Sequence, residues 1–182
     1  MKKVFLCLAL LVLPALALAA SFTSFTLAGD QSSLRVLKSD GSHFDAPKYA
    51  DQVGFSEPRI SADGKHIGWL ALYPNCCTSY PIPLALVVLD ETQQLHSFDG
   101  IKIAVFSWCF MPNARAVGYA QTVVHGSNFQ HFEMRAIADG RLLSQYDYPH
   151  EDADNALARK RAPHWVQCVP DLFPPTQTTN TR

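Results

Sequence analysis

The sequence lacks the features that assign a chain to the common enzyme and nucleic-acid-binding classes. It has no G-x-S-x-G nucleophile motif, no H-E-x-x-H zinc motif, no glycine-rich phosphate loop and no dinucleotide fingerprint. It also has no surplus of positive charge, since 15 Lys and Arg face 16 Asp and Glu. Because phosphate binding needs a basic face, we do not expect nucleic acid as a partner. The sequence therefore predicts a protein that is not an enzyme and needs no cofactor.

A long apolar run is missing as well. The N-terminal run from Val4 to Leu13 is short against the roughly 20 residues that span a bilayer. It follows a basic start and precedes a proline and a small-residue site, Ala17-Leu18-Ala19, which together are typical of a secretory signal peptide. We expect residues 1–19 to be removed by cleavage after Ala19 or Ala20, and the mature protein to be periplasmic, without membrane insertion. Loss of two lysines lowers Lys plus Arg from 15 to 13 against 16 acids, a net charge of −3.

Cysteine is scarce but even in number after that cleavage. The four that remain are Cys76, Cys77, Cys109 and Cys168. In an exported chain disulfides are the default expectation, and four cysteines allow three connectivities. The adjacent pair could bridge to each other or reach the two distant cysteines separately. Their spacing does not match a C-x-x-C zinc motif, so no metal site is predicted.

What the sequence does contain is a β-rich repeat. Between Gly54 and Asp90 a strand-like run, the turn 61–64, a second apolar run, a loop and a third run follow one another. The segment from Phe106 to Asp139 repeats this order, with offsets of 51 at the Phe-Ser pairs and 50 at Gly68 and Gly118. Acidic turns at 38–41, 90–92 and 139–140 take the same place in successive units.

A third, incomplete copy is expected at 165–171, where Trp165 and Cys168 echo Trp108 and Cys109. A period near 50 with about four strands per unit is typical of a β-propeller blade. We therefore predict an all-β domain over 20–173, with antiparallel strands in about three blade-like units that form an open or incomplete propeller. A β-sandwich with similar hairpins is the alternative. The aromatics Trp69, Tyr73, Trp108, Tyr119 and Trp165 are read as strand residues and expected in the core.

The run from Pro58 to Trp69 resembles the "strand, S-x-D-G-K, strand" signature of TolB-type periplasmic propeller repeats. If the units are blades, Cys109 and Cys168 occupy similar places on the first strands of successive units, which favours a Cys109–Cys168 disulfide. A charged, alanine-containing segment predicts one short helix near 151–161, ended by Pro163. The polar tail 174–182 is expected to be disordered.

Two loops offer a binding surface. The loop 73–83 and the hairpin tip near Ser127 link equivalent strands, which places them on one rim. Rigid aromatic and small polar side chains suit a protein interface. The residues predicted to bind a partner are His125, Gly126, Ser127, Asn128, Phe129, Tyr80 and Ile82.

A signal peptide followed by a small all-β domain with a Gly-Ser hairpin tip is similar to periplasmic immunity proteins against type VI secretion amidases. That resemblance implies an inhibitor that inserts a loop into the cleft of a secreted peptidoglycan amidase, with the Ser127 loop as the plug. The alternatives are an envelope scaffold or TolB-like interaction protein, and a hydrolase with an unrecognised site.

Overall fold

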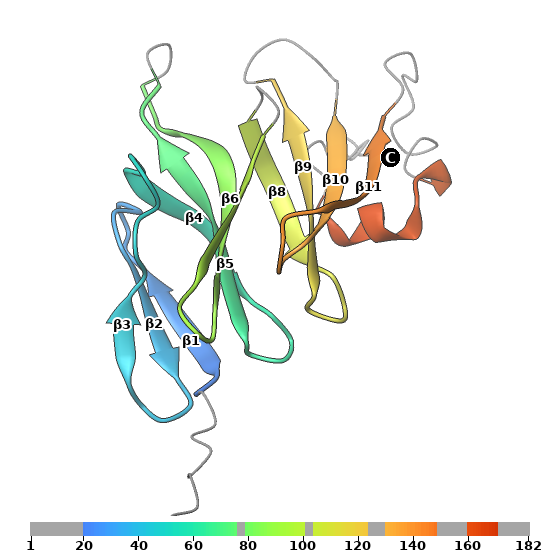
Figure 1. Ribbon diagram of the computed structural model, residues 1–182. Helices are drawn as coiled ribbons and strands as arrows, with labels where there is room; N and C mark the ends of the chain where they lie inside the picture. The colour runs from blue at the N-terminus through green and yellow to red at the C-terminus, as the bar shows by residue number, and fades with distance from the viewer. Residues whose placement is uncertain (1–19, 76–78, 101–103, 124–129, 149–159, 171–182) are drawn as a thin grey trace, which may run out of the picture.

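The computed structural model describes residues 20–75, 79–100, 104–123, 130–148 and 160–170. Within them the chain forms strands and one 3-10 helix (Figure 1): β1 Phe22–Leu27, β2 Leu34–Lys38, β3 His43–Asp45, β4 Gly54–Ile60, β5 His66–Tyr73, β6 Ile82–Asp90, β7 Leu95–Asp99, β8 Ala104–Phe110, β9 Ala116–Thr122, β10 His131–Ala136, β11 Leu142–Asp147 and η1 His164–Cys168. The all-β prediction is confirmed. Among these residues no helix is long and apolar enough to cross a membrane.

The strands form three antiparallel meanders that stand side by side (Figure 1). The first sheet has the order β1-β2-β3, the second β4-β5-β6-β7, and the third β8-β9-β10-β11. Neighbouring sheets meet through β1 against β4 and through β6 against β8. The two four-stranded sheets each have the strand number of a propeller blade, and the arrangement is an open, blade-like series.

The β4–β5 and β8–β9 hairpins match with an offset of 50 residues around Gly68 and Gly118. Gly68 pairs with Arg59, and Gly118 pairs with Cys109. Each first strand contains one bulge, but the bulge falls after Ser56 in β4 and after Val105 in β8. This difference in bulge position explains the offset of 51 that the sequence gives at the Phe-Ser pairs.

The hairpin turns between first and second strands are also equivalent. In the β4–β5 turn Asp63 Oδ1 accepts the Lys65 amide at 3.1 Å, and in the β8–β9 turn Asn113 Oδ1 accepts the Arg115 amide at 3.1 Å. Position four of the turn is left-handed in both, with φ of 69° at Gly64 and 54° at Ala114. Asx side chains favour such turns because they replace a backbone acceptor.

Three layers of apolar side chains separate the sheets. The first lies between sheets one and two, the second between sheets two and three, and the third between sheet three and η1. Sheet two is thus buried on both faces, with Trp69 toward sheet one and Leu70 toward sheet three. The core prediction is confirmed for Trp69, Trp108 and Tyr119, each 0% exposed. Tyr73 and Trp165 are only partly buried, and Trp165 lies on η1 and not on a strand.

The predicted third copy at 165–171 is wrong. Residues His164–Cys168 form the 3-10 helix η1, whose Val166 packs on the outer face of sheet three. The third sheet-forming unit is instead the N-terminal β1-β2-β3. The similarity of Trp165 and Cys168 to Trp108 and Cys109 was not enough to predict a strand, because two shared residue types do not supply the run of alternating side chains that a strand needs.

The disulfide between Cys109 and Cys168 is present, with 6.0 Å between the Cα atoms. The expected pairing is confirmed although its stated reason is not, because Cys168 lies on η1 and not on a first strand. Most of the predicted helix at 151–161 lies outside the described residues, and its last two residues are helical. The predicted signal peptide, the tail 174–182, Cys76 and Cys77 also lie outside them.

Candidate functional site

The β5–β6 and β9–β10 connections leave the molecule at one rim (Figure 1), because β5 and β9 are the second strands of equivalent sheets. Of the predicted partner-binding residues, 125–129 lie outside the described residues. Tyr80 precedes β6 and is 59% exposed, the highest value among the exposed large hydrophobic residues. Ile82 pairs with Tyr73 in the ladder and is only 8% exposed. Tyr80 therefore offers the larger contact surface at this rim.

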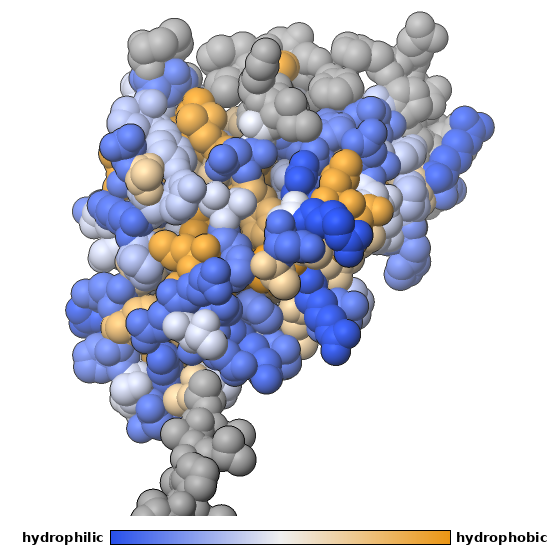
Figure 2. Space-filling model, in the orientation of Figure 1, coloured by the Kyte–Doolittle hydropathy of each residue, from blue (hydrophilic) through white to orange (hydrophobic). Residues whose placement is uncertain are grey.

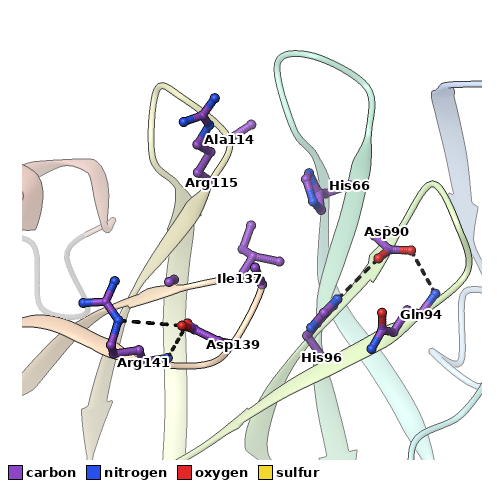
Figure 3. A pocket seen from close by; sticks show the side chains of 11 residues that line it. His66, Asp90, Gln94, His96, Ala114, Arg115, Ile137, Asp139 and Arg141 are labelled. Carbon is purple, nitrogen blue, oxygen red and sulfur yellow. Dashed lines mark hydrogen bonds and ion pairs between the residues drawn. The ribbon is translucent and has the colours of Figure 1, made fainter.

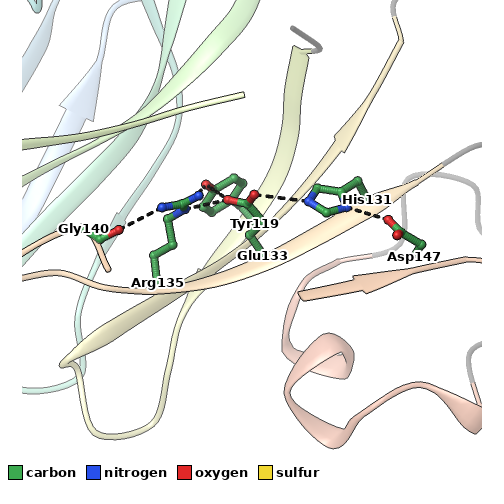
Figure 4. A network of polar contacts seen from close by, with 6 residues as sticks. All are labelled: Tyr119, His131, Glu133, Arg135, Gly140 and Asp147. Atoms are coloured by element: carbon green, nitrogen blue, oxygen red, sulfur yellow. Dashed lines mark hydrogen bonds and ion pairs between the residues drawn. The ribbon is translucent and has the colours of Figure 1, made fainter. Parts of the chain in front are cut away.

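A buried polar network joins β9, β10 and β11 (Figure 4). Glu133 on β10 is 0% exposed and accepts hydrogen bonds from the Tyr119 hydroxyl of β9 and from Arg135 Nε at 2.6 Å. Arg135 also donates to the Tyr119 hydroxyl oxygen at 3.0 Å and to the Gly140 carbonyl at 3.0 Å. His131, the first residue of β10, extends the network to β11 through Asp147. Side chains from three strands are thereby joined.

The network favours the ionised form of Glu133 at its centre. Burial favours a raised pKa for Glu133, but the hydrogen bonds from Arg135, Tyr119 and His131 outweigh burial and lower the pKa below its ordinary value. Burial and the contact with Glu133 raise the pKa of Tyr119, so its hydroxyl stays protonated and donates. A buried carboxylate with this many donors is stable as an anion.

His131 lies between two carboxylates. Its Nδ1 is 2.5 Å from Asp147 Oδ1, and its Nε2 is 3.2 Å from Glu133 Oε1. Since a carboxylate only accepts, an imidazole with a proton on each nitrogen donates to both partners. His131 pairs in the ladder with Gln121 of β9 and with Asp147 of β11. The side chain thus links β10 to β11, and the backbone ladder holds β10 next to β9.

The alternation of residues from His131 to Arg135 is a sequence signal for this network. Polar residues alternate with apolar ones in His131-Phe132-Glu133-Met134-Arg135, which places His131, Glu133 and Arg135 on one face of a strand. Such alternation usually marks a solvated face. Here that face points toward sheet two, so the polar side chains are covered.

A groove opens at the opposite rim, between sheets two and three (Figure 3). Its volume is about 560 Å³, and it is bounded by the turns that follow β6, β8 and β10. The residues that line it are His66, Asp90, Gln94, His96, Ala114, Arg115, Ala136, Ile137, Ala138, Asp139 and Arg141. Cationic and anionic side chains are mixed along its walls, as expected for a polar groove without selectivity for one sign of charge.

The groove side chains that could take part in acid–base chemistry are His66, His96 and the neighbouring acids. Burial is the main cause that lowers the pKa of His66, so this imidazole is neutral at neutral pH. His96 Nε2 lies 3.4 Å from Asp90 Oδ2, while Asp90 Oδ1 accepts the Thr92 amide at 2.8 Å in the adjoining turn. No serine, threonine or cysteine lines the groove. Within the described residues no group of three or more His, Cys, Asp or Glu side chains could hold a metal ion.

No protein-family model matches the chain, and no curated protein matches it. Among solved structures, the tricorn protease aligns with a TM-score of 0.45 at 9% identity over 62% of this chain. The Pyrococcus horikoshii acylaminoacyl peptidase aligns in an orthorhombic crystal form with a TM-score of 0.43 at 14% identity over 72% of this chain, and in uncomplexed form at 15% identity over 71%. The chain spans 13% of the first protein and 25% of the second. Similarity at this level says nothing about activity.

Proposed function

We propose that this protein is a non-enzymatic binding module that recognises another protein through the rim carrying the β5–β6 and β9–β10 connections. The observation behind this proposal is the buried network of Glu133, His131, Arg135, Tyr119 and Asp147. Its His131–Asp147 end lies at the strand ends of this rim, while Arg135 reaches the Gly140 carbonyl in the turn at the other end of β10. A fixed base lowers the entropy lost when a loop binds a partner, because fewer backbone conformations must be frozen.

The exposed side chain of Tyr80 supports partner binding at the same rim. Tyrosine is enriched among the residues that contribute most to binding, since it combines a large rigid contact area with a hydrogen-bonding group. The face seen in Figure 2 is mostly hydrophilic, with apolar side chains in small separate groups. A partner that relies on a few aromatic anchors and polar contacts fits such a surface better than a broad apolar interface does.

In its most specific form, the proposal is that the protein inhibits a cell-wall hydrolase in the periplasm by occluding its cleft. Three features support this form: a sequence that predicts export, a mildly acidic mature chain and two neighbouring rim connections on a rigid β scaffold. Occlusion needs no chemistry from the inhibitor, which agrees with the absence of nucleophile motifs from the sequence. A secreted peptidoglycan amidase is the partner class that we propose.

Two experiments test the proposal: isolation of partner proteins, and a growth assay that measures protection against cell-wall hydrolases. Tagged protein is used to isolate partners from periplasm, and a deletion strain is challenged with neighbouring cells that secrete cell-wall hydrolases. We expect a captured hydrolase, loss of its activity on purified peptidoglycan, and sensitivity of the deletion strain. Absence of any captured hydrolase together with normal growth of the deletion strain would refute the inhibitor function.

Two matched variants test whether the surface around Tyr80 binds the partner. Tyr80→Ala removes an aromatic ring at the rim, whereas Leu143→Ala removes an apolar side chain that is 41% exposed on β11. We expect Tyr80→Ala to weaken partner binding at least about tenfold, the range of interface anchors, and Leu143→Ala to leave binding unchanged. Equal effects of the two variants would place the interface elsewhere.

A further inference from the structure

The groove between sheets two and three has walls of opposite charge (Figure 3). On the sheet-two side Asp90 is the acidic lining residue, and no lysine or arginine of the described ranges lines that side. On the sheet-three side Arg115 and Arg141 line the groove together with Asp139. The sheet-three wall therefore carries more positive than negative charge.

Each ion pair among the lining residues stays within one wall. His96 Nε2 lies 3.4 Å from Asp90 Oδ2 on the sheet-two side, and Arg141 Nε lies 3.7 Å from Asp139 Oδ2 on the sheet-three side. In the part of the chain that the structure describes, no ion pair joins the two walls. The opposite charges are therefore separated by the groove.

Arg115 is a charged lining residue whose side chain has no partner. Its backbone is held, since its amide donates to Asn113 Oδ1 at 3.1 Å and its carbonyl accepts the Ile137 amide at 3.0 Å. Its guanidinium makes no hydrogen bond or ion pair with any described residue. A guanidinium is always charged and presents its N–H donors as a planar fork. This one can bind a carboxylate through two parallel hydrogen bonds.

The sheet-two wall offers acceptors. Asp90 Oδ1 accepts the Thr92 amide at 2.8 Å and the Gln94 amide at 2.9 Å, whereas the described contact of Oδ2 is His96 at 3.4 Å. Burial acts to raise the pKa of Asp90, but hydrogen bonds from Thr92, Gln94 and His96 lower it overall, so this carboxyl is ionised at neutral pH. An ionised carboxylate has about four acceptor positions. Oδ2 can therefore accept a further donor, such as an ammonium group.

The groove also has an apolar floor made of small side chains. Ala114 and Ile137, both lining residues, are each 3% exposed. Ala114 has a φ of 54°, a left-handed conformation that favours glycine, which Gly64 supplies in the equivalent turn of sheet two. The alanine adds a methyl group to the floor. A ligand with small apolar side chains fits such a surface.

A ligand of one charge sign fits this groove poorly. An anion that pairs with Arg115 would also lie near Asp139, and a cation that pairs with Asp90 would face the arginines of the other wall. A molecule that carries both charges pairs with both walls at once. The groove volume of about 560 Å³ lies in the range of small-molecule sites, about 300–1,000 Å³.

We propose that the groove binds a short peptide with free amino and carboxyl termini, whose carboxylate pairs with Arg115 and whose ammonium group pairs with Asp90. The side chains of the peptide are small and apolar and lie against Ala114 and Ile137. This site lies at the rim opposite to the one proposed for protein binding. The two proposals therefore stand or fall independently.

The test uses the purified protein, labelled with nitrogen-15, and the dipeptide alanyl-alanine. Binding is followed by the backbone amide shifts of Gln94, Arg115 and Ile137. Two controls are the same dipeptide acetylated at its amino group and the same dipeptide amidated at its carboxyl group. We expect alanyl-alanine to bind with a Kd of about 1 mM or tighter, and each blocked dipeptide to bind at least about tenfold more weakly. Unchanged shifts at about 20 mM alanyl-alanine, or equal affinity for the three dipeptides, would overturn the proposal.

Arg115→Gln tests the residue assigned to the carboxylate. Its side chain is exposed and has no partner among the described residues, so the variant should keep the stability of the wild type. We expect it to bind alanyl-alanine at least about tenfold more weakly and the amidated dipeptide as the wild type does, because only the free carboxylate contacts Arg115. Arg35→Gln, which changes an exposed arginine of sheet one, should keep the preference for the free carboxylate. A preference retained in Arg115→Gln, or lost to the same extent in Arg35→Gln, would contradict the assignment.

Discussion

Trp108 of β8 packs against Gly68 of β5 so closely that no side chain fits between them. A Cβ atom on Gly68 would lie 2.7 Å from Trp108 Cη2 and 3.2 Å from Cζ3. The indole is held in place because its N–H donates to the Glu57 carbonyl at 3.0 Å. Trp108 is also 0% exposed within the apolar layer between sheets two and three. This contact therefore sets how closely the two sheets approach.

Gly68→Ala should destabilise the protein. The added methyl group meets a rigid ring and not the end of a flexible side chain, so the two sheets must separate or the indole must tilt. Overpacking of this kind costs about 1–3 kcal/mol of unfolding free energy. Urea denaturation followed by tryptophan fluorescence measures the change.

Two alanine variants serve as controls for Gly68→Ala. Gly29→Ala adds a methyl group where nothing lies within 4 Å, and we expect a change within about 0.5 kcal/mol. Gly118→Ala, the equivalent position in sheet three, meets the mobile end of Met111 at 2.9 Å and should cost less than Gly68→Ala. A similar loss in all three variants would contradict the proposed role of the Trp108 contact.

Local turn chemistry made much of the fold predictable. Asp63-Gly64 and Asp139-Gly140 mark hairpin turns in the sequence, and both glycines adopt left-handed φ values in the structure, 69° and 70°. The apolar runs between such turns gave the strands of sheets two and three. The acidic turn 38–41 placed part of a unit near the N-terminus, but that unit could not be matched over a full period, since no strand pairs with β1 as β4 pairs with β5 among the described residues.

The candidate site was less predictable than the fold. Exposed Tyr80 lies where strand equivalence places it, because a hairpin connection follows directly from strand order. The Glu133 network depends on which face of β10 is covered by the neighbouring sheet. That is a tertiary property, and the alternation around Glu133 in the sequence is the same for a covered and for a solvated face.

Glu133→Gln should weaken the third sheet strongly. The substitution keeps the size of the side chain but removes the charge that Arg135 and His131 surround. Because breaking a buried ion pair leaves its partners without compensation, we expect a loss of about 3 kcal/mol in unfolding free energy. Asp45→Asn, which removes the solvent-exposed pair with Arg35, should have a much smaller effect. Equal costs would show that the network contributes no more than a surface pair.

Glu133 should also make stability depend on acid pH. Its pKa in the folded protein is lowered, because hydrogen bonds outweigh the opposing effect of burial. The unfolded chain therefore takes up the proton at a higher pH than the folded protein does. This contribution is complete above about pH 5 and is lost as pH falls below about 4, through the folded pKa.

Urea denaturation at several pH values between about 3 and 7 measures this effect. The wild type should lose stability more steeply with falling pH than Glu133→Gln does. Some slope should remain in the variant, since hydrogen bonds in their turns also lower the pKa of Asp63 and of Asp90 against the effect of burial. Identical slopes would mean that Glu133 does not have a lowered pKa.

Removal of the Cys109–Cys168 disulfide should loosen the attachment of η1 to the outer face of sheet three. The bridge closes a separation of 59 residues, and the loop-entropy relation gives a stabilisation of about 4 kcal/mol for a loop of that length. We expect the double variant Cys109→Ser with Cys168→Ser to lose about that much unfolding free energy. Cys109 is 5% exposed, so a buried hydroxyl adds to the cost at that position.

Substitution and reduction together isolate the effect of the bridge. A reducing agent should lower the unfolding free energy of the wild type and should have a smaller effect on the double serine variant, in which Cys76 and Cys77 are the cysteines left outside the predicted signal peptide. Val166→Ala keeps the bridge but removes apolar contact of η1 with sheet three, at an expected cost of about 1–2 kcal/mol. An equal loss of unfolding free energy in the wild type and the double variant would contradict this prediction. The Cys109–Cys168 bond would then contribute no stability that reduction removes, and the stabilising bond would involve the other cysteines.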